Sequence, residues 1–312
     1  MCIMKTKLIS VLCAGVLIAF GLTGCTTTRA SKSSEDASKT RIISTKLGDV
    51  EVPANPQRVV SSYVEGDLVA LGIVPVAGIA PYEFKGSAFY EEVKDVTLIE
   101  SLEPETVMAQ KPDLIVVISE DDVEKMSKIA PTVFVPFTEL SMEERITFLG
   151  QVVNKEEEAK KLIKDFNYKL ADAKKKLDKT GILNKKVSIF EGADESGSIY
   201  VYGDKWGRGG DLIYNKLGFK APDVIQNEII NGEQYRDISL EVLPEYSGDY
   251  IIFASDIPNS LKGNSVWGNI PAVKENHIIP IDEKLFYYMD IYSANVQLDY
   301  FVEKFLSVSQ SN

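Results

Sequence analysis

The stretch "MEERITFLGQVVNKEEEAKKLIKDFNYKLADAKKKLDK" (142–179) decides the fold of this chain. From Ala159 to Leu177 its apolar residues recur every three or four positions, which places them on one face of a helix. The stretch contains no proline, and Gly181 follows it. We therefore predict one long helix over residues 141–181, with its many charges on a solvated face.

Short apolar runs alternate with helical stretches on both sides of this segment. Near-continuous apolar strands separated by helices are typical of parallel sheets covered by helices. The stretches "PETVMAQKPDLIVVIS" (104–119) and "LEVLPEYSGDYIIFAS" (240–255) look like equivalent elements of two halves. We therefore predict an α/β fold of two Rossmann-like lobes with mainly parallel sheets, residues 41–140 and 182–312, joined by the long helix. A ligand cleft is expected between the lobes, because ligands of α/β folds bind outside the carboxyl ends of the strands.

The N-terminus has the pattern of an export signal. Two lysines precede the apolar run "LISVLCAGVLIAF" (8–20), which is too short to span a membrane comfortably, and "LTGC" ends at Cys25. This motif resembles the bacterial lipobox, in which the cysteine is lipidated and becomes the first residue. It predicts a lipoprotein signal peptide over 1–24, a flexible tether over 25–40 and an extracytoplasmic protein anchored to the cell membrane. The alternative is a chance cysteine behind a membrane anchor helix.

Composition narrows the possible partners. All three cysteines lie in the leader, so the mature chain has no disulfide and no cysteine ligand. Loss of the two leader lysines takes the formal charge from −12 to −14. Such a charge disfavours binding to nucleic acid or to anionic lipid. We expect a monomer without a nucleic acid partner.

Enzyme chemistry is hard to assemble from this sequence. His277 in "KENHIIPI" is the single histidine, and we expect it to be an exposed turn residue. No G-x-S-x-G motif and no phosphate-binding fingerprint occurs. One histidine and no mature cysteine also argue against a zinc site. We expect neither an enzyme nor a cofactor. If the protein is an enzyme after all, the alternatives are an exported α/β hydrolase and a nucleotide-dependent enzyme.

One exposed turn is unusual. "YGDKWGRGGDLIY" (202–214) follows an apparent strand, and we expect it at a carboxyl end facing the cleft. Its glycines let the backbone turn sharply and approach a ligand. Trp206 and Arg208 would then form a binding platform. The alternative is a plain turn, with Trp206 in the core and Arg208 in a surface ion pair.

Several stretches together resemble a known family. They are "PQRVV", "LEPETVMAQKPDLIVV", "IAPTVFV", "WGRGGDLIYNKLGF", "DISLEVLPEYSGDYIIF" and "WGNIPAVKENHIIPID". In this order they are similar to the substrate-binding lipoproteins of ABC importers for iron siderophores, over about residues 45–308. "WGRGG" and "SLEVLPEYSGDYI" resemble most closely the subgroup that takes ferric hydroxamates.

The resemblance implies a site without metal ligands, because a siderophore supplies all the oxygen ligands that Fe³⁺ needs. Aromatic faces and an arginine would then grip a preformed complex. The implied siderophore-binding residues of the C-terminal lobe are Trp206, Arg208, Tyr200 and either Tyr288 or Tyr287. That choice stays open because Ile291 stands where proline usually follows Asp290. For the N-terminal lobe, position at strand ends suggests Tyr63 and Tyr82, with packing in the core as the alternative.

The resemblance also implies docking on ABC permease subunits through one glutamate of each lobe. The matching positions are Glu105 and Glu241, which would otherwise be ordinary acids at helix N-termini. Other ligands remain within this class: a catecholate or citrate-type siderophore, haem or cobalamin. A manganese or zinc receptor is disfavoured by the single histidine.

Overall fold

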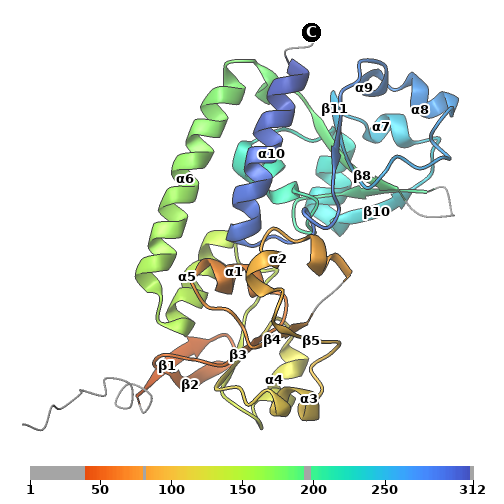
Figure 1. Cartoon of the computed structure of the whole chain (residues 1–312). Coiled ribbons are helices and arrows are strands. Elements are labelled where there is room, and N and C mark those ends of the chain that lie inside the picture. The colour runs from red at the N-terminus through yellow and green to blue at the C-terminus, as the bar shows by residue number, and fades with distance from the viewer. Residues whose placement is uncertain (1–38, 80–81, 193–197, 310–312) are drawn as a thin grey trace, which may run out of the picture.

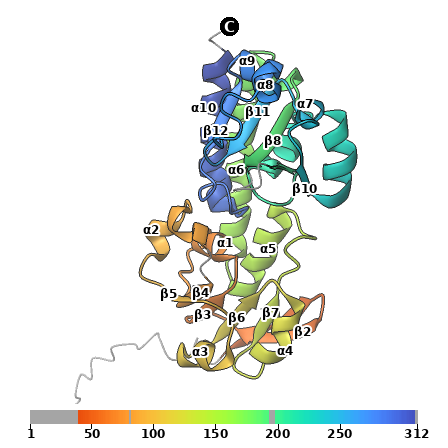
Figure 2. The same cartoon turned by 90° about the vertical axis from the view of Figure 1, so that its right-hand side faces the viewer.

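The computed structural model describes residues 39–79, 82–192 and 198–309. It has two lobes, seen one above the other in Figure 2, and it confirms the two-lobed α/β fold. The predicted leader, Cys25 and nearly all of the predicted tether lie outside the described residues. Within the described residues, no helix combines the length and the apolar character that crossing a membrane requires.

The N-lobe is built on a wholly parallel sheet of strand order β5-β4-β3-β6-β7. Its strands are β3 (Val59–Ser61), β4 (Ala77–Ile79), β5 (Thr97–Ile99), β6 (Leu114–Val117) and β7 (Thr132–Phe134). All four residues of β6 are fully buried, as expected for a parallel strand covered on both faces. Its helices are α1 (Glu65–Ala70), η2 (Tyr82–Gly86), α2 (Tyr90–Val93), α3 (Pro104–Ala109), η3 (Glu120–Asp122) and α4 (Val123–Met126). A separate antiparallel hairpin, β1 (Thr40–Thr45) and β2 (Gly48–Pro53), precedes the sheet.

The segment between the lobes is two helices instead of the single helix that we predict over 141–181. Helix α5 (Met142–Val153) ends at Asn154, which has a left-handed φ of 61°, and α6 (Glu156–Asp178) follows. A Cβ at Gly150 would lie 2.8 Å from the Cβ of Ala159, so the two helices pack closely beside this turn. Helix α6 buries Ala159, Phe166, Ala173 and Leu177, which confirms the predicted apolar face. It runs from the N-lobe along the C-lobe (Figure 1).

The C-lobe is built on a mixed sheet of strand order β10-β9-β8-β11-β12. Its strands are β8 (Val187–Gly192), β9 (Ile199–Tyr202), β10 (Tyr235–Ile238), β11 (Tyr250–Ala254) and β12 (Ile278–Ile281). Its helices are η4 (Ile182–Asn184), the π-helices η5 (Asp211–Leu217) and η6 (Ile225–Glu233), α7 (Leu243–Tyr246), α8 (Ser265–Asn269), α9 (Pro271–Lys274) and α10 (Ile291–Ser309).

Strand β9 does not run parallel to its neighbours, in contrast to the prediction that places the turn after it at the carboxyl end of a parallel strand. β8, β11 and β12 are parallel, but β9 runs antiparallel to β8, and β10 antiparallel to β9. Only residues 193–198 connect β8 to β9, whereas a parallel crossover needs about a dozen residues or more. The turn that begins at Tyr202 therefore does not follow the carboxyl end of a parallel strand, and its approach to the cleft has another cause.

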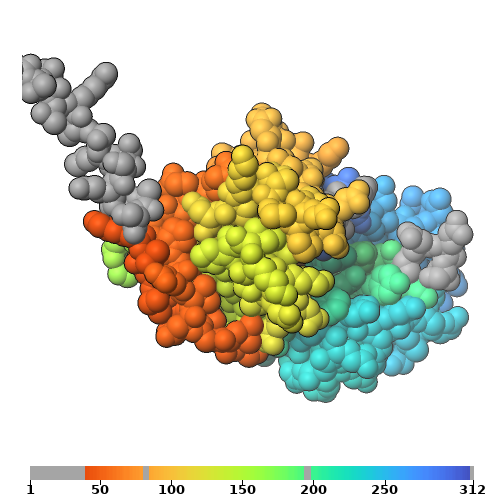
Figure 3. Space-filling model, turned by 90° about the horizontal axis from the view of Figure 1, so that it is seen from below, coloured from red at the N-terminus to blue at the C-terminus, as the bar shows by residue number. Residues whose placement is uncertain are grey.

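The lobes meet along the segment between β12 and α10, and Figure 3 shows the N-lobe in orange to yellow-green beside the C-lobe in cyan and blue. The Lys284 side chain fills the space where a Cβ of Gly86 would lie. Asp290 does the same at Gly66 in α1. Across the same boundary, the hydroxyl of Tyr63 donates to the backbone carbonyl of Tyr287 at 3.3 Å. Residues 282–290 are therefore packed against both lobes.

His277 is buried, so the expectation of an exposed turn residue is wrong. The residue is 7% exposed, and its ring stacks on Tyr250 with a centroid distance of 4.4 Å. Its Nδ1 lies 3.1 Å from the carbonyl oxygen of Asp249. His277 directly precedes β12, and these contacts hold the start of β12 beside the start of β11. We assign the histidine a structural role.

Candidate ligand-binding site

The turn of Trp206 and Arg208 is fastened to residues 282–290 of the lobe boundary. The backbone N–H of Arg208 donates to the carbonyl of Phe286 at 2.7 Å. Gly207 has a φ of 74°, and a Cβ there would lie 2.7 Å from the carbonyl oxygen of Tyr287. Glycine is required at this position for both reasons. Contact with residues 282–290, which we call the crossing segment, and not the direction of β9, brings the turn to the lobe boundary.

The Arg208 side chain is held by a carboxylate on the central strand of the sheet. Its Nε and Nη2 donate to the two carboxylate oxygens of Glu191, at 2.6 and 3.1 Å. Its guanidinium carbon lies 4.5 Å from the ring centroid of Tyr202 and 5.9 Å from that of Tyr287. An ion pair is present, but both side chains are only 16% exposed, so it is not the surface pair of the alternative, and it fixes the guanidinium near two aromatic rings.

Strand register gathers five side chains on one face of the C-lobe sheet. Glu191 in β8 pairs with Tyr200 in β9, which pairs with Asp237 in β10. Tyr202 pairs in the same way with Tyr235. Side chains of paired residues, and of residues two apart, share a face of a sheet. We call these five residues, with Trp206 and Arg208, the aromatic face.

Trp206 extends this face outward. Its ring stacks on Tyr235 at a centroid distance of 4.9 Å and is 51% exposed. The alternative of Trp206 in the core is therefore wrong. An open cavity of about 570 Å³ lies here, lined by Tyr200, Tyr202, Glu233, Tyr235, Arg236 and Asp237. Glu191, Tyr202 and Tyr235 are not among the residues predicted from the sequence. The spacing of two between tyrosines in "YVY" (200–202) is the signal that marks Tyr202.

On the N-lobe, Tyr63 lies two residues after β3 in a left-handed conformation with a φ of 67°. Its ring contacts Phe137 at 4.9 Å and Tyr287 at 5.7 Å between centroids. Burial raises the pKa of the Tyr63 hydroxyl well above its usual range. Tyr63 thus packs at the boundary of the lobes. Tyr82 begins η2, and its side chain lies outside those that the structure describes.

The structure separates the two candidate tyrosines of the crossing segment. Tyr288 is 1% exposed and packs edge-on against Phe89, 4.8 Å between centroids, among the apolar residues beneath α2. Tyr287 is half-buried and faces Arg208. This placement favours Tyr287 as the ligand-facing residue, and that assignment stays a prediction.

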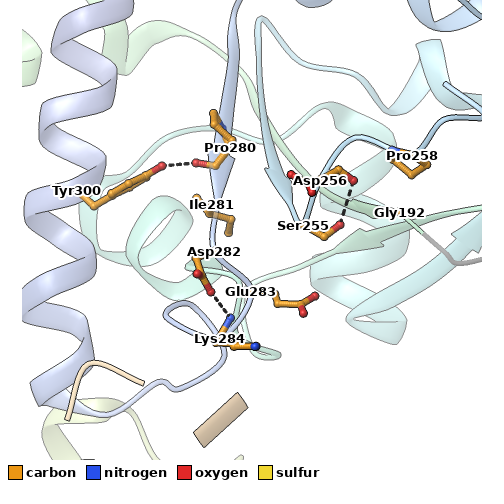
Figure 4. Close-up of a pocket in the computed structure, with 10 residues that line it drawn as sticks. All are labelled: Gly192, Ser255, Asp256, Pro258, Pro280, Ile281, Asp282, Glu283, Lys284 and Tyr300. Carbon is orange, nitrogen blue, oxygen red and sulfur yellow. Dashed lines mark hydrogen bonds between the residues drawn. The ribbon is translucent and has the colours of Figure 1, made fainter. Parts of the chain in front are cut away.

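A larger cavity of about 740 Å³ opens where the parallel strands β8, β11 and β12 end (Figure 4). In that view Ser255 and Asp256, after β11, lie across from Asp282, Glu283 and Lys284, after β12. Gly192, which follows Glu191 directly in β8, also lines the cavity. Ligands of α/β folds bind outside the carboxyl ends of parallel strands, and this cavity lies at the carboxyl ends of these three strands.

A smaller cavity of about 200 Å³ lies between the lobes. It is lined on one side by residues 137–142 and Arg145, and on the other by Asp204, Lys205, Asp211, Asn215 and Met289. The turn of the aromatic face and the N-lobe therefore share one boundary.

The two candidate docking glutamates occupy equivalent places. Glu105 is exposed in the first turn of α3, which leads into β6. Glu241 is exposed just before α7, which leads into β11, and a hydrogen bond from Ser239 lowers its pKa. β6 and β11 each occupy the fourth position of their sheet, next to the central strand. The predicted equivalence of the two stretches is confirmed; the docking role stays a prediction.

Among the residues that the structure describes, no three histidine, cysteine, aspartate or glutamate side chains are grouped so as to hold a metal ion. The site consists of aromatic rings, the Arg208–Glu191 pair, further charged side chains at its edge and open cavities. Such a surface is suited to a preformed ligand that brings its own polar groups.

Comparisons with known proteins agree with this architecture. Residues 59–285 match the family model described as "Periplasmic binding protein". The iron(3+)-hydroxamate-binding protein YxeB of Bacillus subtilis (strain 168) is 32% identical over 95% of this chain and 96% of that protein. The structure of FhuD from S. pseudintermedius superposes with a TM-score of 0.76 at 27% identity, over 86% of this chain and 99% of that chain.

A further solved structure, FhuD2 of Staphylococcus aureus with bound ferrioxamine B, has a TM-score of 0.73 at 29% identity, over 81% of this chain and 99% of that chain. The family match covers well over half of the chain, and it agrees with the family resemblance of the sequence motifs. The chain therefore belongs to the periplasmic binding protein family.

Proposed function

We propose that this chain is the solute-binding component of an ABC importer, and that it captures a ferric siderophore of the hydroxamate type. The observation that carries the proposal is the geometry of Arg208, which Glu191 holds between the rings of Tyr202 and Tyr287 at the lobe boundary. A guanidinium fixed in this way presents N–H donors to hydroxamate oxygens, while Trp206 and Tyr235 supply apolar contact area.

The chemistry of the ligand fits such a surface. Fe³⁺ is a hard cation that three hydroxamates surround completely with oxygen. The protein then needs neither a metal ligand nor a cofactor of its own, and it performs no covalent step. The names of YxeB and of the ferrioxamine-bound FhuD2 support the hydroxamate class for this chain. Catecholate and citrate-type siderophores, haem and cobalamin remain the alternative ligands.

Delivery to the membrane completes the proposal. Lipidation at Cys25 would hold the monomeric protein outside the cell membrane, and one acyl chain contributes about 0.8 kcal/mol per buried CH₂. The exposed Glu105 and Glu241 would pair with basic residues of the permease. Their equivalent positions in the two lobes suit a partner with two related subunits.

Tryptophan fluorescence tests the ligand class. The sequence has two tryptophans: Trp206 is 51% exposed, whereas Trp267 is 6% exposed in α8. The full-length protein, purified in mild detergent, is titrated with a ferric hydroxamate, a ferric catecholate and ferric citrate. Saturable quenching by the hydroxamate, absent in Trp206→Phe, is the expected result. Response to another class alone would leave the fold intact and overturn the hydroxamate assignment.

A further inference from the structure

We propose that Glu191 is a positioning and specificity-determining residue: it fixes Arg208 and offsets its charge, so the site prefers cationic or neutral ferric trihydroxamates over anionic ferric siderophores. This inference rests on the proposed function, since it concerns how the same site selects among siderophores. The family model and the relatives' names assign no role to Glu191.

The first argument is geometric. Glu191 stands on β8, the central strand of the C-lobe sheet, whereas Arg208 stands on a turn at a left-handed φ of 55°. Two parallel N–H···O bonds join their side chains, at 2.6 and 3.1 Å. Bidentate pairs of this kind fix orientation as well as distance. The rigid strand therefore determines where the guanidinium of the turn points.

The second argument concerns the donors that remain. A guanidinium has five N–H donors, and Glu191 accepts from two of its nitrogens. Nη1 lies 3.4 Å from the carbonyl oxygen of Trp206. The remaining N–H groups of Arg208 can donate to ligand oxygens, while the positive charge of Arg208 is balanced by the negative charge of Glu191. Arg208 thus acts as a hydrogen-bond donor whose charge is already offset.

The third argument concerns the charges that surround the pair. Asp237 lies on the same sheet face, opposite Tyr200. Arg236 forms ion pairs with Glu228 and Glu233, so its charge is offset as well. The large cavity that Gly192, the residue after Glu191, lines also contains three carboxylates, Asp256, Asp282 and Glu283, and one ammonium, Lys284.

Lys205 is the exposed ammonium beside Trp206, and it does not reverse this balance. The carboxylates on the aromatic face and around its cavities outnumber the cationic groups. An anionic ligand would therefore enter a negative potential, whereas a cationic ligand is attracted.

The substitution Glu191→Gln tests charge with little change of volume. Glutamine keeps one oxygen that accepts from Arg208, but it leaves the positive charge without its counter-ion. Affinity for an anionic ligand should rise and affinity for a cationic ligand should fall, each by about 3- to 10-fold for one charge at this range.

A series of ligands of one shape makes the measurement decisive. Three hydroxamates neutralise Fe³⁺, so the net charge of a linear trihydroxamate complex is that of its terminal amine. The free amine gives a cation, its acetyl derivative a neutral complex and its succinyl derivative an anion. Equilibrium dialysis with radioiron gives the Kd of each for the full-length protein in mild detergent.

Wild type should bind the cationic complex at least as tightly as the neutral one, and both more tightly than the anionic one. In Glu191→Gln the order should flatten or invert, whereas Glu191→Asp, which keeps the charge, should retain it. Asp237→Asn, an exposed site, should shift the preference the same way and serves if Glu191→Gln does not fold. Glu303→Gln, an exposed acid on α10, should change nothing.

Two results would overturn the inference while leaving the proposed function in place. One is equal weakening of all three complexes by Glu191→Gln, which would mean a structural role only. The other is wild-type affinity for the anionic complex that equals that for the cationic one. Failure of wild type to bind any of the three would instead overturn the proposed function, and the inference with it.

Discussion

Asp67 and Arg145 form a buried ion pair, with 2.6 Å between Asp67 Oδ2 and Arg145 Nε and side chains that are 0% and 3% exposed. The second oxygen of Asp67 accepts from the N–H of Ile291, the first residue of α10, at 3.0 Å. Arg145 Nη2 donates to the carbonyl of Met289 at 2.6 Å. One pair thus joins α1 of the N-lobe, α5 and the start of α10, and it fixes one end of the crossing segment that carries Tyr287.

Arg145→Met should lower the free energy of unfolding by about 3–5 kcal/mol, because it leaves buried carboxylates without their cation. Asp67 loses its partner, and Asp290, whose pKa burial and the neighbouring Asp67 raise to about 6, loses a nearby positive charge. Urea denaturation followed by circular dichroism measures the change. Arg41→Met is the matched control: the Arg41–Glu156 pair is 26% and 42% exposed and should contribute under about 1 kcal/mol. Equal losses in both variants would contradict this reading.

Stability should fall as the pH rises from about 4.5 towards 7. Burial raises the pKa of Glu65 from 4.5 to about 7, and Ser61 donates a hydrogen bond to this carboxyl at 3.0 Å. The folded state keeps the proton to a higher pH than the unfolded state does. The contribution of Glu65 is therefore complete below about pH 4.5 and is lost towards pH 7, by about 1.4 kcal/mol per pH unit.

Denaturation at pH 5 and pH 8 checks this dependence, with Glu65→Gln as the comparison. The difference in free energy of unfolding between the two pH values should be smaller in Glu65→Gln than in wild type. An unchanged difference would show that Glu65 is not the group that titrates.

The two adjacent tyrosines should differ in function. The hydroxyl of Tyr288 is buried without a hydrogen-bond partner among the described residues, so Tyr288→Phe should leave stability unchanged or raise it by up to about 1 kcal/mol. Siderophore affinity should also stay the same. Tyr287→Ala, which removes the ring beside Arg208, should weaken siderophore binding at least about 5-fold, in the range of a lost aromatic contact. If Tyr288→Phe weakens siderophore binding and Tyr287→Ala does not, then Tyr288, and not Tyr287, is the ligand-facing residue.

Charge reversal at the docking glutamates should separate binding from transport. Glu105→Lys and Glu241→Lys should keep the wild-type siderophore Kd but reduce cellular iron uptake at least about 10-fold, because like charges would meet at the permease. Glu124→Lys on α4, whose wild-type side chain is 89% exposed, is the control and should transport normally. Normal uptake by both variants would remove these residues from the docking surface.

Local patterns in the sequence predicted the two-lobed α/β architecture, although not the break at Asn154 or the direction of β9. The three-to-four spacing of residues 159–177 predicts the buried face of α6, and the apolar runs at 114–117 and 250–254 predict the buried strands β6 and β11. Each of these signals lies within one element, because periodicity reports which face of that element is buried. The same holds for the turn of Trp206 and Arg208, whose composition marks an unusual surface.

What only the tertiary structure decided depends on contacts between distant residues. The partner of Arg208 lies 17 residues away on strand β8, and that of Arg145 lies 78 residues away on another helix. Tyr287 and Tyr288 are neighbours in a loop, where no periodicity tells which one is buried, and packing against Phe89 makes the choice. The antiparallel direction of β9 places Tyr200 beside Glu191. Burial and ion pairing in these cases follow from three-dimensional packing, which no single segment of the sequence contains.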